Sequence, residues 1–175
     1  FIQKVKEIDD IKSYICTTNP SNFIYTGFIC KLMPEAKIIY CFRNPLDNII
    51  ELYSNNLKSK YTFKNSIKET SKLILYINFI MKKYKKMFPS NIFFLDYDKL
   101  VNNPSKEIKA LTNWLEWEFN DKYLYPNLDF STTNNLDKNL NRINALNTNK
   151  WQNYKELLTP AINTFESEKL NINLD

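Results

Sequence analysis

The chain has 175 residues, which suits a single domain, and 43% of them are hydrophobic, which excludes global disorder. It contains no histidine, so the commonest general base and the commonest metal ligand are both excluded. The net charge of +5 suits an anionic small ligand or an acidic peptide, and is lower than we expect of a nucleic-acid-binding domain.

The first part of the chain predicts helices on either side of a buried strand. Residues 7–14 are typical of the end of a helix, and a second helix follows the break at Asn19, with a broad apolar face over residues 23–33. Residues 36–42 are apolar, β-branched and aromatic without alternation. This run predicts a strand of a parallel sheet that is buried on both faces.

A helix start follows this strand directly. Asn44 suits the N-cap, Pro45 suits the first helical position, and Asp47 places an acid in the first turn. The pattern predicts a helix to about Leu57. Arg43 therefore stands between the end of a strand and the beginning of a helix.

The second part of the chain repeats this order. A long helix is predicted over 67–87, a second buried strand over 92–95, and a helix after Asn103 and Pro104. Residues 118–149 lack a regular pattern, and residues 151–170 predict a helix that Pro160 starts or kinks. Alternating helices and strands indicate an α/β fold with parallel strands, and we expect residues 1–175 to form one domain.

Several residue counts limit the kind of site. Cys16, Cys30 and Cys41 are odd in number and lack metal-ligand spacing, which predicts thiols in the core and a reducing compartment, the cytoplasm. Gly27 is the only glycine, so glycine-rich phosphate loops are excluded from this chain.

No apolar run approaches the roughly 20 residues of a membrane span. Because the chain begins at Phe1 and two strands make a small sheet, we expect further strands upstream in a longer chain.

Arg43 is the strongest candidate for a binding residue. Only Arg43 and Arg142 are arginines, and the planar guanidinium binds phosphate in a way that lysine cannot. Ligands of open α/β sheets bind at the carboxyl ends of the strands, where Arg43 lies beside the free N–H groups of a helix start. The pattern predicts a phosphate or sulfate site, and the alternative is a structural ion pair with Asp47.

Five other residues near the predicted edge allow two interpretations each. Tyr97 ends the second strand and either contacts a ligand or packs in the core. Asp96 and Asp98 flank it and suit helix capping better than a metal site. Lys150 is either a phosphate contact or a solvated side chain, and the adjacent Trp151 is better explained as a core anchor.

Four segments in this order resemble the sulfotransferase family, most closely the bacterial enzymes related to the tyrosylprotein type that are often fused to tetratricopeptide repeats. The main one is residues 34–48 (PEAKIIYCFRNPLDN), which resembles the family's signature strand and turn. The others are residues 19–23 (NPSNF), residues 94–100 (FLDYDKL) with the following Asn103 and Pro104, and residues 144–154 (NALNTNKWQNY).

The resemblance implies a P-loop-like three-layer α/β sandwich whose N-terminal strand and loop are missing from this chain. It implies transfer of a sulfuryl group from 3′-phosphoadenosine 5′-phosphosulfate to an acceptor hydroxyl, on a protein tyrosine or a carbohydrate, without a metal. By position, Arg43 would bind the 3′-phosphate, Tyr97 would contact the nucleotide, and Lys150 would close the site. Asn135 falls where the family has a serine, and it can still form a hydrogen bond. The partners implied are the nucleotide donor and a protein or carbohydrate acceptor.

This sequence also departs from the family pattern. The 5′-phosphosulfate loop and the carboxylate base that follows it are absent, so the catalytic residue is unknown. Thr18 replaces an expected lysine, and Glu51 replaces a serine that would bind the 3′-phosphate. Two hypotheses follow: part of a sulfotransferase whose longer chain supplies the loop and base, or a degenerate, non-catalytic binding module.

Overall fold

A computed structural model describes residues 16–54, 66–125 and 148–172, with the side chains of 168–172 left out. The helix expected at 7–14 lies outside these ranges. The elements are, in chain order, the 3₁₀ helix η1 (Pro20–Tyr25), α2 (Thr26–Leu32), β1 (Ile38–Phe42), α3 (Pro45–Ser54), α4 (Ile67–Met87), β2 (Ile92–Asp96), α5 (Tyr97–Asn102), α6 (Pro104–Trp114), the 3₁₀ helices η3 (Asp121–Leu124) and η4 (Lys150–Tyr154), and α7 (Thr159–Ile172).

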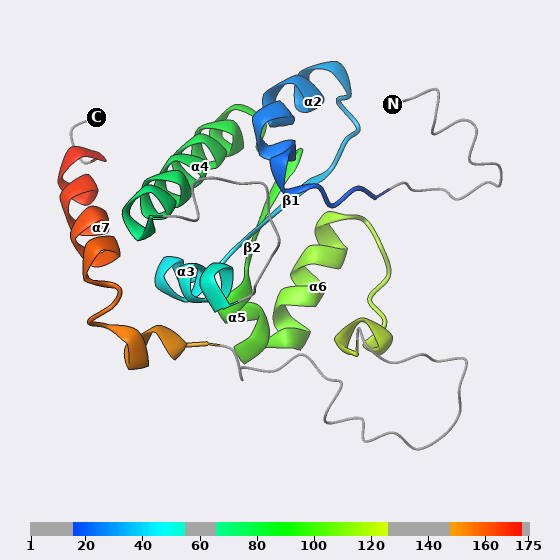
Figure 1. Cartoon of the computed structure of the whole chain (residues 1–175). Helices are drawn as coiled ribbons and strands as arrows, with labels where there is room; N and C mark the ends of the chain where they lie inside the picture. The colour runs from blue at the N-terminus through cyan, green and yellow to red at the C-terminus, as the bar shows by residue number, and fades with distance from the viewer. Residues whose placement is uncertain (1–15, 55–65, 126–147, 173–175) are drawn as a thin grey trace.

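The two strands form a parallel sheet, as the alternation of helices and strands predicted. Their register pairs Ile38 with Ile92 at one end and Phe42 with Asp96 at the other. Both strands therefore end at the same edge, and α3 and α5 begin there (Figure 1). The predicted parallel topology is confirmed, and the first strand begins two residues later than expected.

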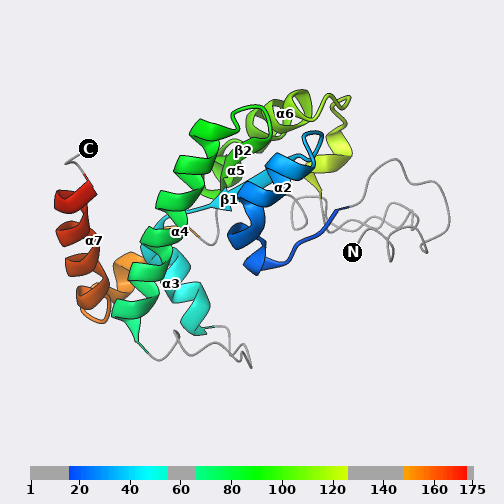
Figure 2. The same cartoon turned by 90° about the horizontal axis from the view of Figure 1, so that it is seen from above.

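Helices cover both faces of this sheet and make three layers (Figure 2). On one face, α2 and α4 contribute Cys30 and Met81 to a core that includes Ile92, which is fully buried. On the other face, the Phe93 ring lies 5.3 Å from the ring of Trp114 in α6. Successive strand residues point to opposite faces, so this arrangement follows directly from the apolar character of both strands.

A second core joins helices that come from distant parts of the chain. The buried side chains Ile49 of α3, Ile74 of α4 and Phe165 of α7 pack together, and Trp151 packs against them. The predicted role of Trp151 as a core anchor is confirmed. Of the two roles predicted for Pro160 in the helical segment 151–170, the start is confirmed: Pro160 lies in the first turn of α7, where its missing N–H costs least, and a turn at residues 155–158 separates η4 from α7.

Two expectations about burial are also wrong. Strand β1 is not buried on both faces, because Ile39 and Cys41 are exposed while Ile38 and Tyr40 pack toward α4. The helix before it leaves Phe28 and other apolar side chains exposed. Among the described residues, α6 covers the neighbouring strand β2, and nothing comparable covers these positions of β1 and α2. Of the three cysteines, only Cys30 is buried.

Gly27 of α2 lies against the ring of Tyr84 in α4. A Cβ atom at this position would lie 2.7 Å from Cε1 of Tyr84, which is closer than carbon atoms approach without a clash. The absence of a side chain therefore allows the two helices to meet. Among the helices of the described ranges, none combines the length and the apolar character that crossing a membrane requires.

Candidate functional site

The turn after β1 is held by short polar contacts at the carboxyl edge of the sheet. The side chain of Asn44 caps α3, accepting hydrogen bonds from the backbone N–H of Leu46 at 2.9 Å and of Asp47 at 3.3 Å. The predicted N-cap is confirmed. The expectation of free N–H groups at this helix start is wrong, because the cap accepts from both and Pro45 has no N–H.

Arg43 extends from this turn over an aromatic ring. Its guanidinium carbon lies 4.9 Å from the centre of the Tyr97 ring, and Nη2 lies 3.9 Å from Oδ2 of Asp47. The ion pair is longer than a hydrogen bond, so Asp47 acts on Arg43 through charge. The side chain is 14% exposed, and the ring fixes the plane of the cation. Both sequence interpretations of Arg43 therefore have support in the structure: Arg43 forms an ion pair with Asp47, and it lines a cavity.

That cavity has a volume of about 360 Å³ and lies at the carboxyl end of both strands. The size is in the range of small-molecule sites. Its walls combine the strand ends with α4 and the turn. The lining residues are Tyr40, Phe42, Arg43, Asn44, Pro45, Asn78, Lys82, Phe94, Asp96 and Asp98.

Aromatic side chains form one wall of the cavity. The Tyr40 and Phe42 rings stack with their centres 6.1 Å apart, and the Phe94 ring meets Tyr40 edge-on at 5.2 Å. The Tyr40 hydroxyl donates a hydrogen bond to Oδ1 of Asn78 in α4. Burial raises the pKa of the Tyr40 hydroxyl to about 12, so it stays protonated at neutral pH. This wall of the cavity is therefore aromatic and uncharged.

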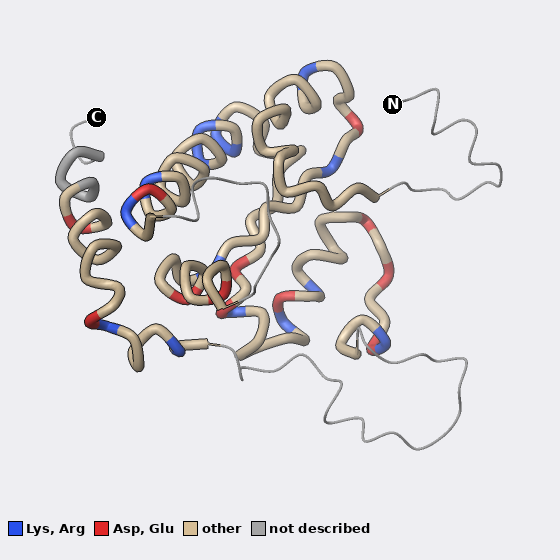
Figure 3. The backbone as a smooth tube through the Cα atoms, in the orientation of Figure 1, with Lys and Arg blue, Asp and Glu red and all other residues tan. Residues whose placement is uncertain are grey.

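Two carboxylates on the cavity wall are engaged by the protein itself. Asp96 caps α5, accepting from the N–H of Asp98 at 3.0 Å and of Lys99 at 3.2 Å, which confirms the predicted capping. Asp98 reaches across the edge, and its Oδ2 accepts from the N–H of Asn44 at 2.6 Å. Figure 3 shows acidic residues on α3 and α5 beside the end of β2. These contacts fix the turn and reduce the repulsion that an incoming anion would meet.

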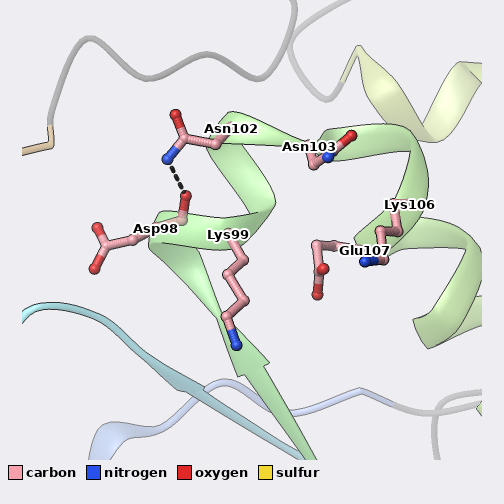
Figure 4. Close-up of a pocket in the computed structure, with 6 residues that line it drawn as sticks. All are labelled: Asp98, Lys99, Asn102, Asn103, Lys106 and Glu107. Atoms are coloured by element: carbon pink, nitrogen blue, oxygen red, sulfur yellow. Dashed lines mark hydrogen bonds between the residues drawn. The ribbon is translucent and has the colours of Figure 1, made fainter.

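A second hollow adjoins the first at Asp98. It measures about 300 Å³ and is lined by residues of α5 and α6 (Figure 4): Asp98, Lys99, Asn102, Asn103, Lys106 and Glu107. The Asp98 carboxylate points away from Lys106 and Glu107, toward the Arg43 turn. Since this hollow has neither an aromatic wall nor Arg43, the larger cavity is the better candidate site.

One buried carboxylate, that of Asp47, binds the C-terminal segment (residues 148–154) to the turn that carries Arg43 (residues 43–47, the Arg43 turn). Asp47 is 2% exposed; its Oδ2 accepts from the N–H of Asn149 at 2.7 Å, and its Oδ1 accepts from the N–H of Trp151 at 2.9 Å. Asn149 adopts a left-handed backbone conformation, which asparagine tolerates better than most residues. Lys150 lies between the two fastened residues, with an exposed side chain outside the lining of the cavity.

The structure brings together most of the described residues that the sequence singled out. Arg43 and Tyr97 are in contact, and Lys150 is linked to them through Asp47. Thr18 is exposed ahead of η1, and Glu51 is half-buried on α3. Asn135 lies outside the described residues, so its predicted role stays a prediction.

Sequence reasoning missed important contacts of three residues at this site. It gives Asp47 a place in the first helical turn and an ion pair with Arg43, but not the link to Asn149 and Trp151. It predicts a cap for Asp98, whose carboxylate accepts from the N–H of Asn44, and it does not single out Lys82, which lines the cavity. The only local signal was the acid four residues after Arg43; no pattern indicates a contact across half the chain. Within the described ranges, no group of three or more acidic or cysteine side chains is arranged to hold a metal ion.

Comparison with known proteins gives a consistent result. A model of the family described as "Sulfotransferase family" matches residues 1–121. An uncharacterized protein of Aquifex aeolicus is 28% identical over 167 residues, covering 93% of this chain. The structure is similar to the sulfotransferase domain from the curacin biosynthetic pathway, with a TM-score of 0.54 and 16% identity over 77% of this chain.

The chain spans 22% of the length of the Aquifex protein and 53% of the curacin domain. The structural likeness establishes the P-loop-like α/β fold with its parallel sheet. The family match covers well over half of the residues. The chain therefore belongs to the sulfotransferase family.

Proposed function

We propose that this protein binds 3′-phosphoadenosine 5′-phosphosulfate at the cavity beside Arg43 and takes part in sulfuryl transfer to an acceptor hydroxyl. The observation that supports this most directly is the position of Arg43. It follows the end of β1, lies over Tyr97, and lines a cavity of about 360 Å³ with an aromatic wall. A guanidinium suits a phosphate, and stacked rings suit a nucleobase.

In this proposal the reaction is an in-line displacement. The acceptor oxygen bonds to sulfur while the bond from sulfur to the bridging oxygen of the 5′-phosphate breaks, leaving 3′,5′-bisphosphoadenosine and a sulfate ester. The proton of the acceptor hydroxyl passes to a base. Arg43 binds the 3′-phosphate, Tyr97 holds the guanidinium in place, and Lys150 adds positive charge from the C-terminal segment. The dipole of α3 adds a weaker attraction for anions at the same edge.

We also propose the narrower properties that the sequence predicts. These are a relationship to the bacterial tyrosylprotein type, a protein tyrosine or carbohydrate acceptor, one domain over residues 1–175, a hydrogen-bonding role for Asn135, and a cytoplasmic location. The four ordered motifs support the first. The described cysteines, all in the free form, support the last.

Calorimetric titration with 3′,5′-bisphosphoadenosine tests the proposal. We expect Arg43→Ala to weaken binding by about ten- to a hundredfold, the effect of losing a hydrogen bond to a charged group. Adenosine 5′-monophosphate, which lacks the 3′-phosphate, should bind equally weakly to both proteins. Lys72→Ala is the matched control, because Lys72 pairs with Glu69 on the exposed face of α4. Equal affinities of the wild type and Arg43→Ala would refute the assignment.

One observation favours the alternative of a non-catalytic module. Glu51 is half-buried on α3, two turns beyond Arg43, where the family pattern has a phosphate-binding serine. A carboxylate near a bound phosphate lowers affinity by charge repulsion. If the wild type does not bind the nucleotide and Glu51→Ser does, the alternative replaces the first proposal.

A further inference from the structure

We propose that Asp47 is a positioning residue that holds Lys150 against the Arg43 turn and so joins the two cationic parts of the donor site. This inference rests on the proposed function of the site. The sequence gives Asp47 a place in the first turn of the helix and an ion pair with Arg43, but it assigns no link between Asp47 and the C-terminal segment.

The contacts of Asp47 are unusual for an acid in the first turn of a helix. Such an acid ordinarily accepts from the N–H groups of its own helix or stays in solvent. Asp47 is 2% exposed, and both of its oxygens accept N–H groups from residues more than a hundred positions later, Asn149 and Trp151. Hydrogen bonds to a buried carboxylate are stronger than those between neutral groups.

The spacing of the two contacts determines what is held. The N–H groups of Asn149 and Trp151 bind the two oxygens of one carboxylate, so the backbone of Lys150 between them is fixed on both sides. The left-handed conformation of Asn149 turns its N–H toward the same carboxylate that Trp151 reaches. Trp151 is further held by packing against the core of α3, α4 and α7.

The same carboxylate also acts on the other cation. Oδ2 of Asp47, which accepts from Asn149, lies 3.9 Å from Nη2 of Arg43. One buried negative charge therefore sits between Arg43 and the segment that carries Lys150. A nucleotide phosphate that contacts both cations requires the two segments at a fixed separation, and Asp47 sets that separation.

The proposal predicts a change in nucleotide affinity that is opposite in direction to the change that charge alone predicts. Removing a negative charge near Arg43 should by Coulomb's law strengthen the binding of an anion. If Asp47 positions Lys150, Asp47→Asn should instead weaken the binding of 3′,5′-bisphosphoadenosine, by about tenfold, because one charge-assisted contact with the backbone is lost. Asp47→Glu, which keeps the charge on a longer arm, should recover part of that affinity.

Two measurements on the purified protein test this. In hydrogen exchange, the amides of Asn149 and Trp151 should be protected in the wild type and should exchange at least about tenfold faster in Asp47→Asn. In calorimetry, Asp47→Asn should have little further effect in a Lys150→Ala background, because both changes remove the same contact. Asp121→Asn is the matched control, since Asp121 is exposed in η3.

The outcomes separate this inference from the proposed function. Unprotected amides in the wild type, or equal exchange rates in the wild type and Asp47→Asn, would overturn the positioning role, whether or not the nucleotide binds. The measurement on the wild type does not depend on the folding of a variant. Tighter binding in Asp47→Asn, or fully additive effects with Lys150→Ala, would also overturn it. Protected amides together with no nucleotide binding by the wild type would refute the proposed function.

Discussion

The two ends of the parallel sheet are closed by opposite chemistry. At the carboxyl end, acids accept backbone N–H groups: Asp98 from Asn44, and Asp47 from the C-terminal segment. At the amino end, donors meet backbone carbonyls: the amide of Asn91 binds the carbonyl oxygens of Pro34 and Ala36, and Lys85 binds those of Pro89 and Ile92.

The backbone groups involved lie mainly in the connections between helices and strands. At the carboxyl end the donors are Asn44 and the C-terminal segment, and at the amino end most of the acceptors are in the turns before the two strands. Arg43 lies among these acceptors and, together with Lys82, brings positive charge to the cavity, which is the physical reason to associate this end of the sheet with an anionic ligand.

The largest effect is expected at the amino end, in stability. Ile92→Ala should lower the free energy of unfolding by about 2–5 kcal/mol, because the side chain is fully buried and its removal leaves a cavity. Ile39→Ala on β1 is the matched control and should cost far less, since Ile39 is 40% exposed. Urea unfolding measures both. Similar losses in the two variants would contradict the described packing of the sheet.

At the carboxyl end, the contact between α5 and the Arg43 turn can be removed alone. Asp98→Ala should lower the free energy of unfolding by about 1–3 kcal/mol, since it leaves the N–H of Asn44 without its carboxylate partner. Asp121→Ala, at an exposed position of η3, should change it by less than about 0.5 kcal/mol. Chemical denaturation compares the pair, and equal effects would show that the turn does not depend on Asp98.

Replacing the Asn91 amide by a carboxylate tests directly whether the amino end of the sheet requires hydrogen-bond donors. Asn91→Ala should lower the free energy of unfolding by about 1–2 kcal/mol, since the amide group binds two carbonyl oxygens. Asn91→Asp should cost at least as much, because a carboxylate would face the same carbonyls. If the aspartate variant is the more stable of the two in thermal unfolding, the rule of opposite chemistry fails at this edge.

The smallest expected effect is a change in stability at alkaline pH. The pKa of Tyr40 is raised from its usual value of 10 to about 12 by burial, so the folded state retains the proton that the unfolded state loses. The contribution of Tyr40 to stability is complete below about pH 10 and is lost as the pH rises to about 12. Tyr40→Phe should be less sensitive to pH across this window in unfolding experiments. An unchanged pH profile would contradict the burial of the hydroxyl.

Local signals in the sequence predicted most of the fold. The order of strands and helices, the cap at Asn44 and the long helix over 67–87 depend on neighbouring residues, and all are confirmed. The exposed face of β1 could not be predicted, because the burial of Ile39 depends on which helices cover the sheet. Arg43 was found because a strand end and a helix start coincide there. The predicted ion pair of Asp47 with Arg43 is present, but its contacts with Asn149 and Trp151 could not be predicted, because they are defined by tertiary packing.

The long sequence separation between Asp47 and its partners also determines when these contacts can form during translation. Its two backbone partners follow it by 102 and 104 positions. At a translation rate of roughly 5–20 residues per second, a nascent chain carries this acid for about 5 seconds or more before either partner leaves the ribosome. The edge that bears Arg43 is therefore completed only after both strands and the helices between them have been made.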